Sequence, residues 1–293
     1  MYAASNRHDL TSGSIWKSLL RFALPLLAGS LVQQLYNTID LIFVGNFIDK
    51  SASAAVGASS LLITCLVGVF GGIGIGSGIV IAQIFGSKDT ERLSRTIHNT
   101  AAMSIVSGLL MMLLGYLLAP VYLQLVRTPA ELLDSAAGYL RIYSLSFLSV
   151  IAYNFGSGIL RALGDSKSPL YAQLVGGLLN VAMDYLFIRV LDDGVNGVAW
   201  ATLISQTASA IMVLICLARL DSAYALRPAK IAFDRELLKR TVSVGMPAGI
   251  QSLVITLSNV MVQYHINSFG EDAIAAFTAY FKVELLVYLP IVA

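Results

Sequence analysis

The sequence predicts an all-α integral membrane protein, folded as a polytopic bundle of long helices. Of its 293 residues, 57% are hydrophobic and only 12% are charged, about half of the charged fraction of an ordinary soluble domain. The charged residues are also unevenly spread. The longest stretches without one are 51–87, 96–126, 194–218 and 241–270. Apolar runs beyond about 18 residues are typical of membrane-spanning helices.

Charged residues and turn signals divide the chain into seven full spans and part of an eighth. Several of these exceed the roughly 20 residues that a bilayer needs, so we expect the longer ones to tilt or to protrude into the headgroup region. The predicted spans cover residues 16–47, 54–85, 93–119, 135–160, 168–190, 195–219, 237–268 and 273 onward.

The basic residues indicate which way the spans run. Fourteen of the 19 Lys and Arg residues fall on the side that holds the N-terminal tail, against four on the opposite side. The positive-inside rule therefore places the N-terminus in the cytoplasm, and we expect a multi-pass protein of the plasma (inner) membrane. The fourteen are Arg7, Lys17, Arg21, Lys88, Arg92, Arg95, Arg161, Lys167, Arg219, Arg227, Lys230, Arg235, Lys239 and Arg240, and the four are Lys50, Arg127, Arg141 and Arg189.

The composition and the motifs argue against several other classes. A net charge of +2 leaves no excess for binding nucleic acid. Cys65 and Cys216 lie inside apolar runs, where packing is expected instead of a disulfide or a metal site. The chain holds no Gly-Lys-Ser/Thr, His-Glu-x-x-His or Cys-x-x-Cys motif. We therefore expect no enzyme activity, no metal site beyond a possible Na⁺ site, no cofactor and no use of ATP within this chain.

Glycines are concentrated in the second predicted span. Their spacing does not fit a dinucleotide-binding fingerprint, and no strand precedes them. The pairs Gly68/Gly72, Gly72/Gly76 and Gly74/Gly78 are instead four residues apart, which places each pair on one helix face. Small residues at this spacing predict close packing against another helix.

The seventh span repeats part of the first. A shift of 222 residues aligns seven identical residues within 23 positions. Because six spans separate the copies, both enter the membrane in the same direction, which is the parallel repeat of transporters with two halves. The identities are Pro25/Pro247, Ser30/Ser252, Leu31/Leu253, Val32/Val254, Leu35/Leu257, Asn37/Asn259 and Phe47/Phe269.

The repeat suggests a domain organisation. Two copies would need about 440 residues, whereas this chain has 293. We interpret it as a truncated protein or a fragment. The expected parts are a cytoplasmic N-terminal tail (1–14), a complete N-lobe of six transmembrane helices (15–219), a cytoplasmic inter-lobe linker (220–236) and the start of a C-lobe with helix 7 and part of helix 8 (237–293).

Two acids of the N-lobe lie well inside predicted spans, where ionisable groups are costly and indicate function. Asp40 and Asp184 belong to the first and fifth spans, which both run outward, and lie seven and six residues from their outer ends. The two carboxylates are therefore expected at a similar depth. Asn180 lies one turn from Asp184 on the same face, and Tyr139 and Thr202 of the fourth and sixth spans should reach the same layer.

This layer of oxygen-bearing side chains has two interpretations. It could bind a proton, because desolvation and a neighbouring carboxylate favour the protonated acid, or a Na⁺ ion, because oxygen ligands suit hard cations. Alternatively each group only bonds a neighbouring backbone or side chain, an alternative that is strongest for Tyr139 and Thr202 taken singly. We favour the functional interpretation for Asp40 and Asp184.

Other polar residues give less specific signals. The amides and the phenol near Asp40 could line a substrate cavity or simply join helices. Two prolines, one in each copy of the repeat, would bend their helices or free backbone carbonyls. The first group is Gln33, Gln34, Tyr36 and Asn37, and the prolines are Pro25 and Pro247.

A third group is expected to be structural or cannot be placed. We expect structural roles for two of the three histidines and a solvated cytoplasmic turn around residues 161–167. No depth can be assigned to the charges of the incomplete last span. These residues are His98, His265, Arg161, Asp165, Lys167, Lys282 and Glu284.

Three stretches carry a resemblance to a known family. They are Leu35-Tyr36-Asn37-Thr38-Ile39-Asp40, with Pro25 before it and Phe43-Val44-Gly45 after it, Ala82-Gln83-Ile84-Phe85-Gly86 at the end of the glycine-rich span, and Arg161-Ala162-Leu163-Gly164-Asp165. Through these motifs the chain resembles the multidrug and toxic compound extrusion (MATE) family, over essentially its whole length. The resemblance implies twelve helices in two six-helix lobes around a V-shaped cavity. It also implies export of organic cations or other amphipathic drugs coupled to H⁺ or Na⁺ entry, by a protein that is monomeric at full length.

The DinF-like branch of that family is the most similar. There the resemblance implies an N-lobe cation site at Asp40, Asn180, Asp184, Tyr139 and Thr202, the residues already singled out by depth. The C-lobe site of the NorM-like branch is not expected, because residues 247–264 contain no acid and Val262 stands at the repeat position of Asp40.

Two alternatives to an ion-coupled drug exporter remain open. One is a lipid-linked oligosaccharide flippase of the same superfamily, for which we expect a cationic cavity that the N-lobe sequence does not suggest. The other is a seven-helix receptor, against which the cytoplasmic N-terminus and the repeat both argue.

Overall fold

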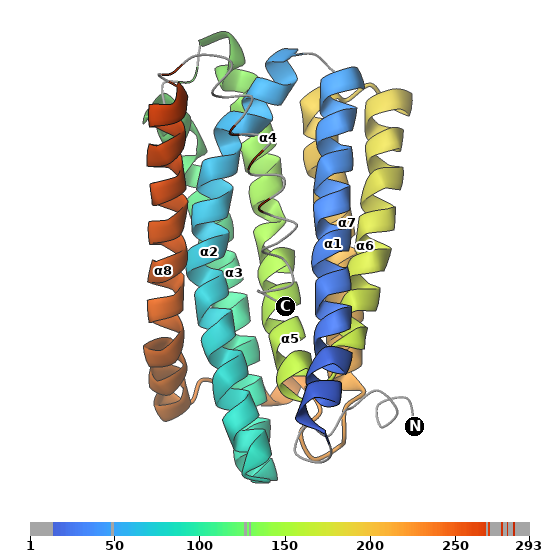
Figure 1. The fold of residues 1–293 in the computed structure, drawn as a ribbon, viewed down its shortest axis with the longest axis vertical. Coiled ribbons are helices and arrows are strands. Elements are labelled where there is room, and N and C mark those ends of the chain that lie inside the picture. Colours follow the sequence, from blue (N-terminus) through green and yellow to red (C-terminus); the bar gives the residue numbers. More distant parts are fainter. Residues whose placement is uncertain are drawn as a thin grey trace.

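The computed structural model shows long helices that run alternately up and down in one bundle (Figure 1). It describes residues 14–47, 50–125, 128, 130–267, 269, 277, 280 and 284, and gives the backbone alone for 15, 37, 40–47, 50–58, 61, 263, 264 and 267. The elements are α1 (Ile15–Phe47), α2 (Lys50–Gly86), α3 (Thr90–Leu125), α4 (Ala130–Leu145), α5 (Phe147–Ala162), α6 (Lys167–Tyr185), a π-helical turn (Leu186–Val190), α7 (Gly194–Ala218), a 3-10 turn (Pro228–Lys230) and α8 (Arg235–Asn267).

These helices match the predicted membrane spans. Six of them, α1, α2, α3, α6 with its π-helical turn, α7 and α8, contain stretches long and apolar enough to cross a bilayer, and α4 and α5 together form a seventh, bent span. The predicted all-α membrane fold is therefore confirmed. The predicted eighth span, from 273 onward, lies almost wholly outside the described residues.

The fourth span, expected over 135–160, is not one continuous helix. It is divided into α4 and α5, which meet at Ser146 with a bend of 41°. The hydroxyls of Ser144 and Ser146 donate to the carbonyl oxygens of Leu140 and Tyr143, each at 2.6 Å. Hydroxyls that bond to the preceding turn in this way bend helices. The bend packs on α3 at Gly115, where a Cβ would come 2.5 Å from Oγ of Ser144.

The glycines of α2 bring it into backbone contact with α8, which lies beside it in Figure 1. A Cβ on Gly76 would come 2.5 Å from Cα of Gly245, and one on Gly249 would come 2.6 Å from the carbonyl oxygen of Val69. The predicted role of these glycines in close helix packing is confirmed. We call this contact the glycine seam, made by the pairs Gly68/Ser252, Gly72/Gly249 and Gly76/Gly245.

The other two glycines of the predicted set face α5 instead. A Cβ on Gly74 would lie 3.2 Å from the ring of Phe155, and one on Gly78 would lie 3.6 Å from the carbonyl oxygen of Gly158. The glycine-rich helix therefore packs closely on two sides, against α8 and against α5.

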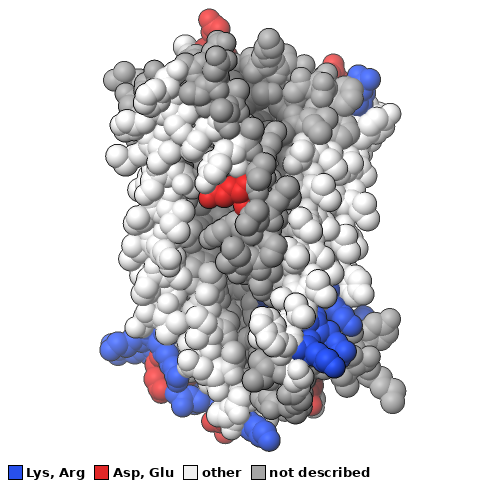
Figure 2. Space-filling model, in the orientation of Figure 1, with Lys and Arg blue, Asp and Glu red and all other residues white. Residues whose placement is uncertain are grey.

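Basic side chains gather mainly at one end of the bundle (Figure 2). This is the end at which α1 begins and at which the linker joins α7 to α8 (Figure 1). We call it the linker end. The charge asymmetry on which the predicted orientation rests is thus visible on the folded chain.

The turn between α5 and α6, also at the linker end, explains the stretch from Arg161 to Asp165. Gly164 has φ +84°, a left-handed conformation that favours glycine. The N–H groups of Gly164 and Asp165 donate to the carbonyl oxygens of Arg161 and Leu160, which closes the end of α5. The Asp165 carboxylate then accepts from the N–H groups of Lys167 and Ser168, at 3.1 and 2.9 Å, and starts α6.

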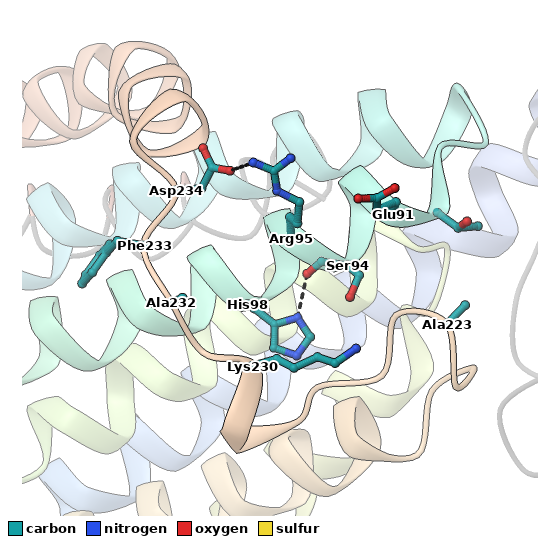
Figure 3. Close-up of a pocket in the computed structure, with 10 residues that line it drawn as sticks. Glu91, Ser94, Arg95, His98, Ala223, Lys230, Ala232, Phe233 and Asp234 are labelled. Carbon is teal, nitrogen blue, oxygen red and sulfur yellow. Dashed lines mark hydrogen bonds and ion pairs between the residues drawn. The ribbon is translucent and has the colours of Figure 1, made fainter.

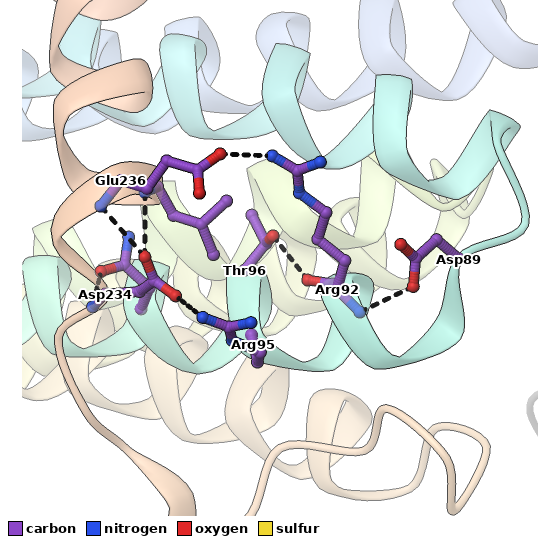
Figure 4. Close-up of polar contacts among 8 residues, drawn as sticks. Asp89, Arg92, Arg95, Thr96, Asp234 and Glu236 are labelled. Atoms are coloured by element: carbon purple, nitrogen blue, oxygen red, sulfur yellow. Dashed lines mark hydrogen bonds and ion pairs between the residues drawn. The ribbon is translucent and has the colours of Figure 1, made fainter.

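The linker is fastened to the first turns of α3. Arg92 pairs with Glu236 at 2.6 Å, and Arg95 pairs with Asp234 (Figure 4). The backbone N–H of Asp234 donates to Oδ1 of Asn99 at 2.9 Å. Because Arg92, Arg95 and Asn99 all belong to α3, these contacts fix the start of α8 relative to α3.

Asp234 also caps α8. Its Oδ1 accepts from the backbone N–H groups of Glu236 and Leu237, at 3.0 and 3.2 Å (Figure 4). The hydrogen bond from Leu237, together with the bond and charge of Arg95, outweighs partial burial and lowers the pKa of Asp234 below its ordinary value.

A pocket of about 550 Å³ lies between the linker and α3 (Figure 3). His98 is at its base and is 3% exposed. Nδ1 of His98 lies 2.7 Å from the carbonyl oxygen of Ser94, and Nε2 accepts from the backbone N–H of Arg227 at 3.0 Å. His98 therefore has the structural role that was predicted for it.

Candidate functional site

A cavity of about 570 Å³ lies in the bundle between α1, α2, α5 and α6. We call it the central cavity. Of the four predicted lining residues, Gln33 and Tyr36 face it, and so does Pro25. Gln34 is exposed and lies outside this lining, and the side chain of Asn37 is outside the described part of the chain.

The glycine-rich helix shapes a second groove that adjoins the central cavity. It also has a volume of about 570 Å³ and shares Val67, Gly68, Asn154, Arg161 and Ser252 with the cavity lining. Its floor includes Gly71, a position where an added Cβ would meet nothing within 4 Å. The absence of side chains along this part of α2 therefore leaves room for a ligand.

Several polar lining residues were not predicted. They include amides in the middle of apolar spans. This signal is visible in the sequence, and the same signal led to the prediction of Gln33. Arg161, expected in a solvated turn, is exposed and lines the cavity at its linker end. Among the unpredicted polar lining residues are Tyr153, Asn154, Arg161, Gln173 and Gln206.

The contact of α1 with α6 fixes the depth of the predicted acids. Gly177 of α6 faces α1, because a Cβ there would lie 3.3 Å from Cδ1 of Tyr36. Both helices start at the linker end. Position 40 lies four residues beyond Tyr36, about 6 Å along the axis, and Asn180 and Asp184 lie about 4.5 and about 10.5 Å beyond Gly177. The backbone at position 40 is thus at a depth between Asn180 and Asp184.

Helix α7 brings Thr202 to the same depth. Nε2 of Gln206 donates to the phenol oxygen of Tyr36 at 3.4 Å. Asp40 lies one turn from Tyr36, in the direction away from the linker end. Because α7 runs opposite to α1, Thr202 lies one turn from Gln206 in that same direction. Three helices therefore place predicted residues in one layer.

Tyr139 of α4 lies beside this layer. It packs in one cluster with Ile188 and Val198. Ile188 is one turn beyond Asp184, and Val198 is one turn from Thr202, so Tyr139 contacts the turns that adjoin both residues.

The described side chains of the layer are withdrawn from solvent. Asp184 is 0% exposed and Asn180 is 2% exposed. Oδ1 of Asn180 has no hydrogen-bond partner among the described residues. Thr202 donates its hydroxyl to the carbonyl oxygen of Val198 at 3.0 Å, which leaves its oxygen lone pairs free to accept or to coordinate. The side chain of Asp40 lies outside the described part of the chain.

A π-helical turn follows the buried acid directly. It spans Leu186–Val190, and the N–H of Leu191 donates to the carbonyl oxygen of Leu186 at 3.0 Å. Such wide turns are frequent at functional sites because they change the register of the helix. No feature of the sequence predicted this turn.

The remaining predicted residues do not join the layer. Helices α1 and α8 continue through Pro25 and Pro247. His265 is exposed, and its Nδ1 lies 2.8 Å from the carbonyl oxygen of Met261 within its own helix. Glu284 is exposed, and Lys282 lies outside the described residues.

A sequence profile of the family described as MatE matches residues 25–186, more than half of the chain. The chain belongs to the MatE family. The predicted resemblance is thereby confirmed, whereas its assignment to the DinF-like branch stays a prediction.

Relatives in the MatE family carry names that refer to drug transport. The probable multidrug resistance protein YpnP of Bacillus subtilis is 28% identical over 98% of this chain and 64% of its own length. The multidrug export protein MepA of Staphylococcus aureus is 23% identical over 92% of this chain and 60% of its own length. The chain thus spans less than two thirds of these relatives.

Solved MatE structures share the fold. A multidrug resistance MATE transporter of the MOP superfamily, described as outward-facing, is 26% identical and superposes with a TM-score of 0.87 over 96% of this chain and 62% of its own. A MATE protein described as being in a straight conformation also gives a TM-score of 0.87 at 26% identity, over 96% of this chain and 63% of its own.

Proposed function

We propose that this protein is a secondary active transporter that exports amphipathic drugs or organic cations in exchange for H⁺ or Na⁺. The observation that carries the proposal is the buried layer formed by Asp184, Asn180 and Thr202 at the depth of Asp40. Ionisable groups at membrane depth are costly, so a buried carboxylate there is a candidate for function. Membership of the MatE family and the drug-transport names of the relatives support the same conclusion.

The geometry suggests how ion binding would act on the drug. Asp40 and Asp184 belong to α1 and α6. Two ionised carboxylates in this layer repel each other, and a bound proton or Na⁺ removes the repulsion and favours the approach of α1 to α6. Because Gln33 and Tyr36 of α1 line the central cavity, a movement of α1 changes the space available to the drug. The ion shifts the conformational equilibrium by its differential affinity for the two states.

We propose that the described contacts belong to a state that is closed at the linker end. There the glycine seam joins α2 to α8, and the linker is paired with α3 through Arg95 and Asp234. The similarity to an outward-facing transporter supports the proposal that the cavity opens at the opposite end in this state. With the linker end in the cytoplasm, as the basic residues indicate, the drug would leave on the outer side of the plasma membrane.

The partners proposed for the full-length protein are a small-molecule drug or organic cation and the lipid bilayer. The lining suits an amphipathic drug. The second groove, which adjoins the central cavity, is largely apolar, and Gln33, Gln206 and Asn154 add hydrogen-bonding groups. We propose that the transporter acts as a monomer.

The test is dye efflux from vesicles that contain the protein at the full length of its relatives, under an imposed pH or Na⁺ gradient. We expect one gradient to drive efflux. Asp40→Asn and Asp184→Asn should each reduce gradient-driven efflux by about 5- to 150-fold, the usual range of a coupling free energy, without preventing dye binding. Asp134→Asn, at an exposed carboxylate of α4, is the matched control. If both core variants exported dye like the control, the coupling mechanism would be wrong.

A flippase for lipid-linked oligosaccharides remains the second candidate because Arg161 lines the central cavity, which gives that cavity a basic side chain the sequence had not suggested. A related structure is described as having a pocket of reversed polarity that suggests a different function for a MOP superfamily transporter. Absence of dye efflux under both gradients, with lipid-linked sugar moved in the same vesicles, would favour this candidate.

A further inference from the structure

An apolar groove lies on the face of the bundle away from the central cavity. It runs between α3, α5 and α7, and has a volume of about 400 Å³. Figure 1 draws α3 and α7 behind α2 and α1, so the groove is on the rear of that view. Among its lining residues in the described chain, Ser104 alone has a polar side chain. Large side chains at the groove, including Ile105, Ile211 and Ile215, are between 43% and 50% exposed.

The linker closes the groove at the linker end. Leu226, Pro228 and Ile231 line this part. The N–H of Leu226 donates to the carbonyl oxygen of Leu217 at 3.1 Å, and the N–H of Arg227 donates to His98 at 3.0 Å. These two bonds attach the linker to α7 and to α3, so the backbone beside the groove is held in place from both sides.

Three basic residues are next in the sequence to residues that line this closed end. Arg219, Arg227 and Lys230 each adjoin a lining residue in the sequence, and all three are exposed. None of the three forms an ion pair with an acid in the described part of the chain. Asp221 is the one acid between residues 219 and 230, and its Oδ1 accepts a backbone hydrogen bond from Ala223 at 3.0 Å. Between residues 219 and 230 the three basic residues outnumber the single acid, so this segment of the chain carries a net positive charge.

An exposed aromatic ring lies on the linker near this end of the groove. Phe233 is 54% exposed on the linker, beside the pocket that contains Lys230. Exposed apolar side chains such as phenylalanine can insert at the boundary between the headgroups and the acyl chains. A groove that is apolar along its length and has basic residues near one end matches the acyl chain and the anionic headgroup of a phospholipid.

We propose that this groove binds an anionic phospholipid, with an acyl chain between α3, α5 and α7 and the phosphate headgroup on Arg219, Arg227 and Lys230. Within a bilayer an acyl chain gains little by leaving other chains for an apolar groove. Selection therefore comes from the charge of the headgroup, and the groove fixes where the lipid lies. Because its backbone N–H bonds to His98, Arg227 links the bound lipid to the contact that holds the linker on α3.

The test uses the full-length protein in nanodiscs of equal parts phosphatidylglycerol and phosphatidylcholine, followed by native mass spectrometry of the lipids that stay bound. We expect phosphatidylglycerol to be retained preferentially. Arg227→Gln with Lys230→Gln should lower this preference by about fivefold for each residue replaced. Arg235→Gln with Lys239→Gln removes the same charge from exposed residues at the start of α8, outside the groove, and should leave the preference unchanged.

A second variant tests the position of the acyl chain. Ala218 is exposed and lines the groove, so Ala218→Trp should fill the groove and reduce retention of the lipid. Leu117 is an exposed residue of α3 outside the groove lining, so Leu117→Trp should leave retention unchanged. A photoreactive side chain at Ile215 should label lipid. Equal retention of the two lipids, equal effects of the two charge variants, undiminished retention in Ala218→Trp, or labelling of a protein segment at Ile215 would each overturn the proposal.

Discussion

His98 and Arg227 are joined by a hydrogen bond that connects α3 to the middle of the linker, from the Arg227 N–H to Nε2 of His98 at 3.0 Å. Because Nε2 accepts this bond, Nδ1 must carry the ring proton and donate it to the carbonyl oxygen of Ser94, 2.7 Å away. The ring is therefore neutral in this arrangement, and both of its nitrogens are in use.

The first prediction concerns this bond. His98→Ala leaves the Arg227 N–H without its partner, which should destabilise the attachment of the linker by about 1–3 kcal/mol. Trypsin should then cleave after Lys230 faster than in the unaltered protein, whereas the Arg227–Pro228 bond resists trypsin in every variant. His265→Ala, which changes an exposed histidine of α8, is the control. Equal cleavage rates in all three proteins would contradict this account.

The second prediction concerns the glycine seam. A Cβ on Gly72 would overlap the backbone nitrogen of Gly249, so Gly72→Ala should force α2 and α8 apart and destabilise the protein by about 1–3 kcal/mol. Gly71→Ala is the matched control on the adjacent residue, where a Cβ meets nothing within 4 Å. It should be neutral or stabilise by up to about 1 kcal/mol, because alanine favours the helix.

Thermal unfolding in detergent measures both variants. A cysteine pair across the seam would in addition report the separation of the helices, since its rate of crosslinking should fall in Gly72→Ala and not in Gly71→Ala. Similar unfolding temperatures for the two variants would show that the close approach is not a constraint.

The third prediction concerns pH. Since the folded-state pKa of Asp234 is lowered, its contribution to stability is fully present above the pKa of the unfolded chain, about 3.9, and is lost as the pH falls through the lower folded-state value. Asp234→Asn removes the carboxylate, so its stability should change less than that of the unaltered protein between neutral and strongly acidic pH. Denaturant unfolding at several pH values measures this. Parallel pH profiles would contradict the prediction.

The fourth prediction concerns Asn180. Its side-chain oxygen is buried without a partner among the described residues, one turn from Asp184. If it serves as a ligand or acceptor for the coupling ion, Asn180→Ala should raise the ion concentration for half-maximal efflux about tenfold, equivalent to about 1.4 kcal/mol. Gln34→Ala, at an exposed amide of α1, should have no such effect. A lower maximal rate at an unchanged ion concentration would instead indicate a purely structural role.

Much of this fold is predictable because the membrane imposes strong constraints on the sequence. Charge-free runs mark the spans, and the depth of Asp184 follows from counting residues to the end of its helix. The spacing of Gly72 and Gly76 indicates close packing on one face. Each of these signals depends on a single helix, which is why each can be read without knowing the neighbours.

Other features depend on several helices at once. The bend at Ser146 needs the hydroxyl bonds and the open surface at Gly115 on α3. The cavity role of Arg161 depends on how the end of α5 is placed against α1, α2 and α6. The partner of the glycine face, α8, is far away in the sequence. Local patterns hold no information on such pairings.

The glycine seam also bears on how often the protein can change its conformation. Where backbone meets backbone, as at Gly76 and Gly245, no side chain loses rotamer freedom when the surfaces join and none regains it when they part. The two helices can therefore separate and return to the same register with little change in side-chain entropy. A transporter that repeats its cycle many times per second would need a helix contact that can open and close in this way. Because the seam has no spare space, each of its glycines is intolerant of even one added methyl group.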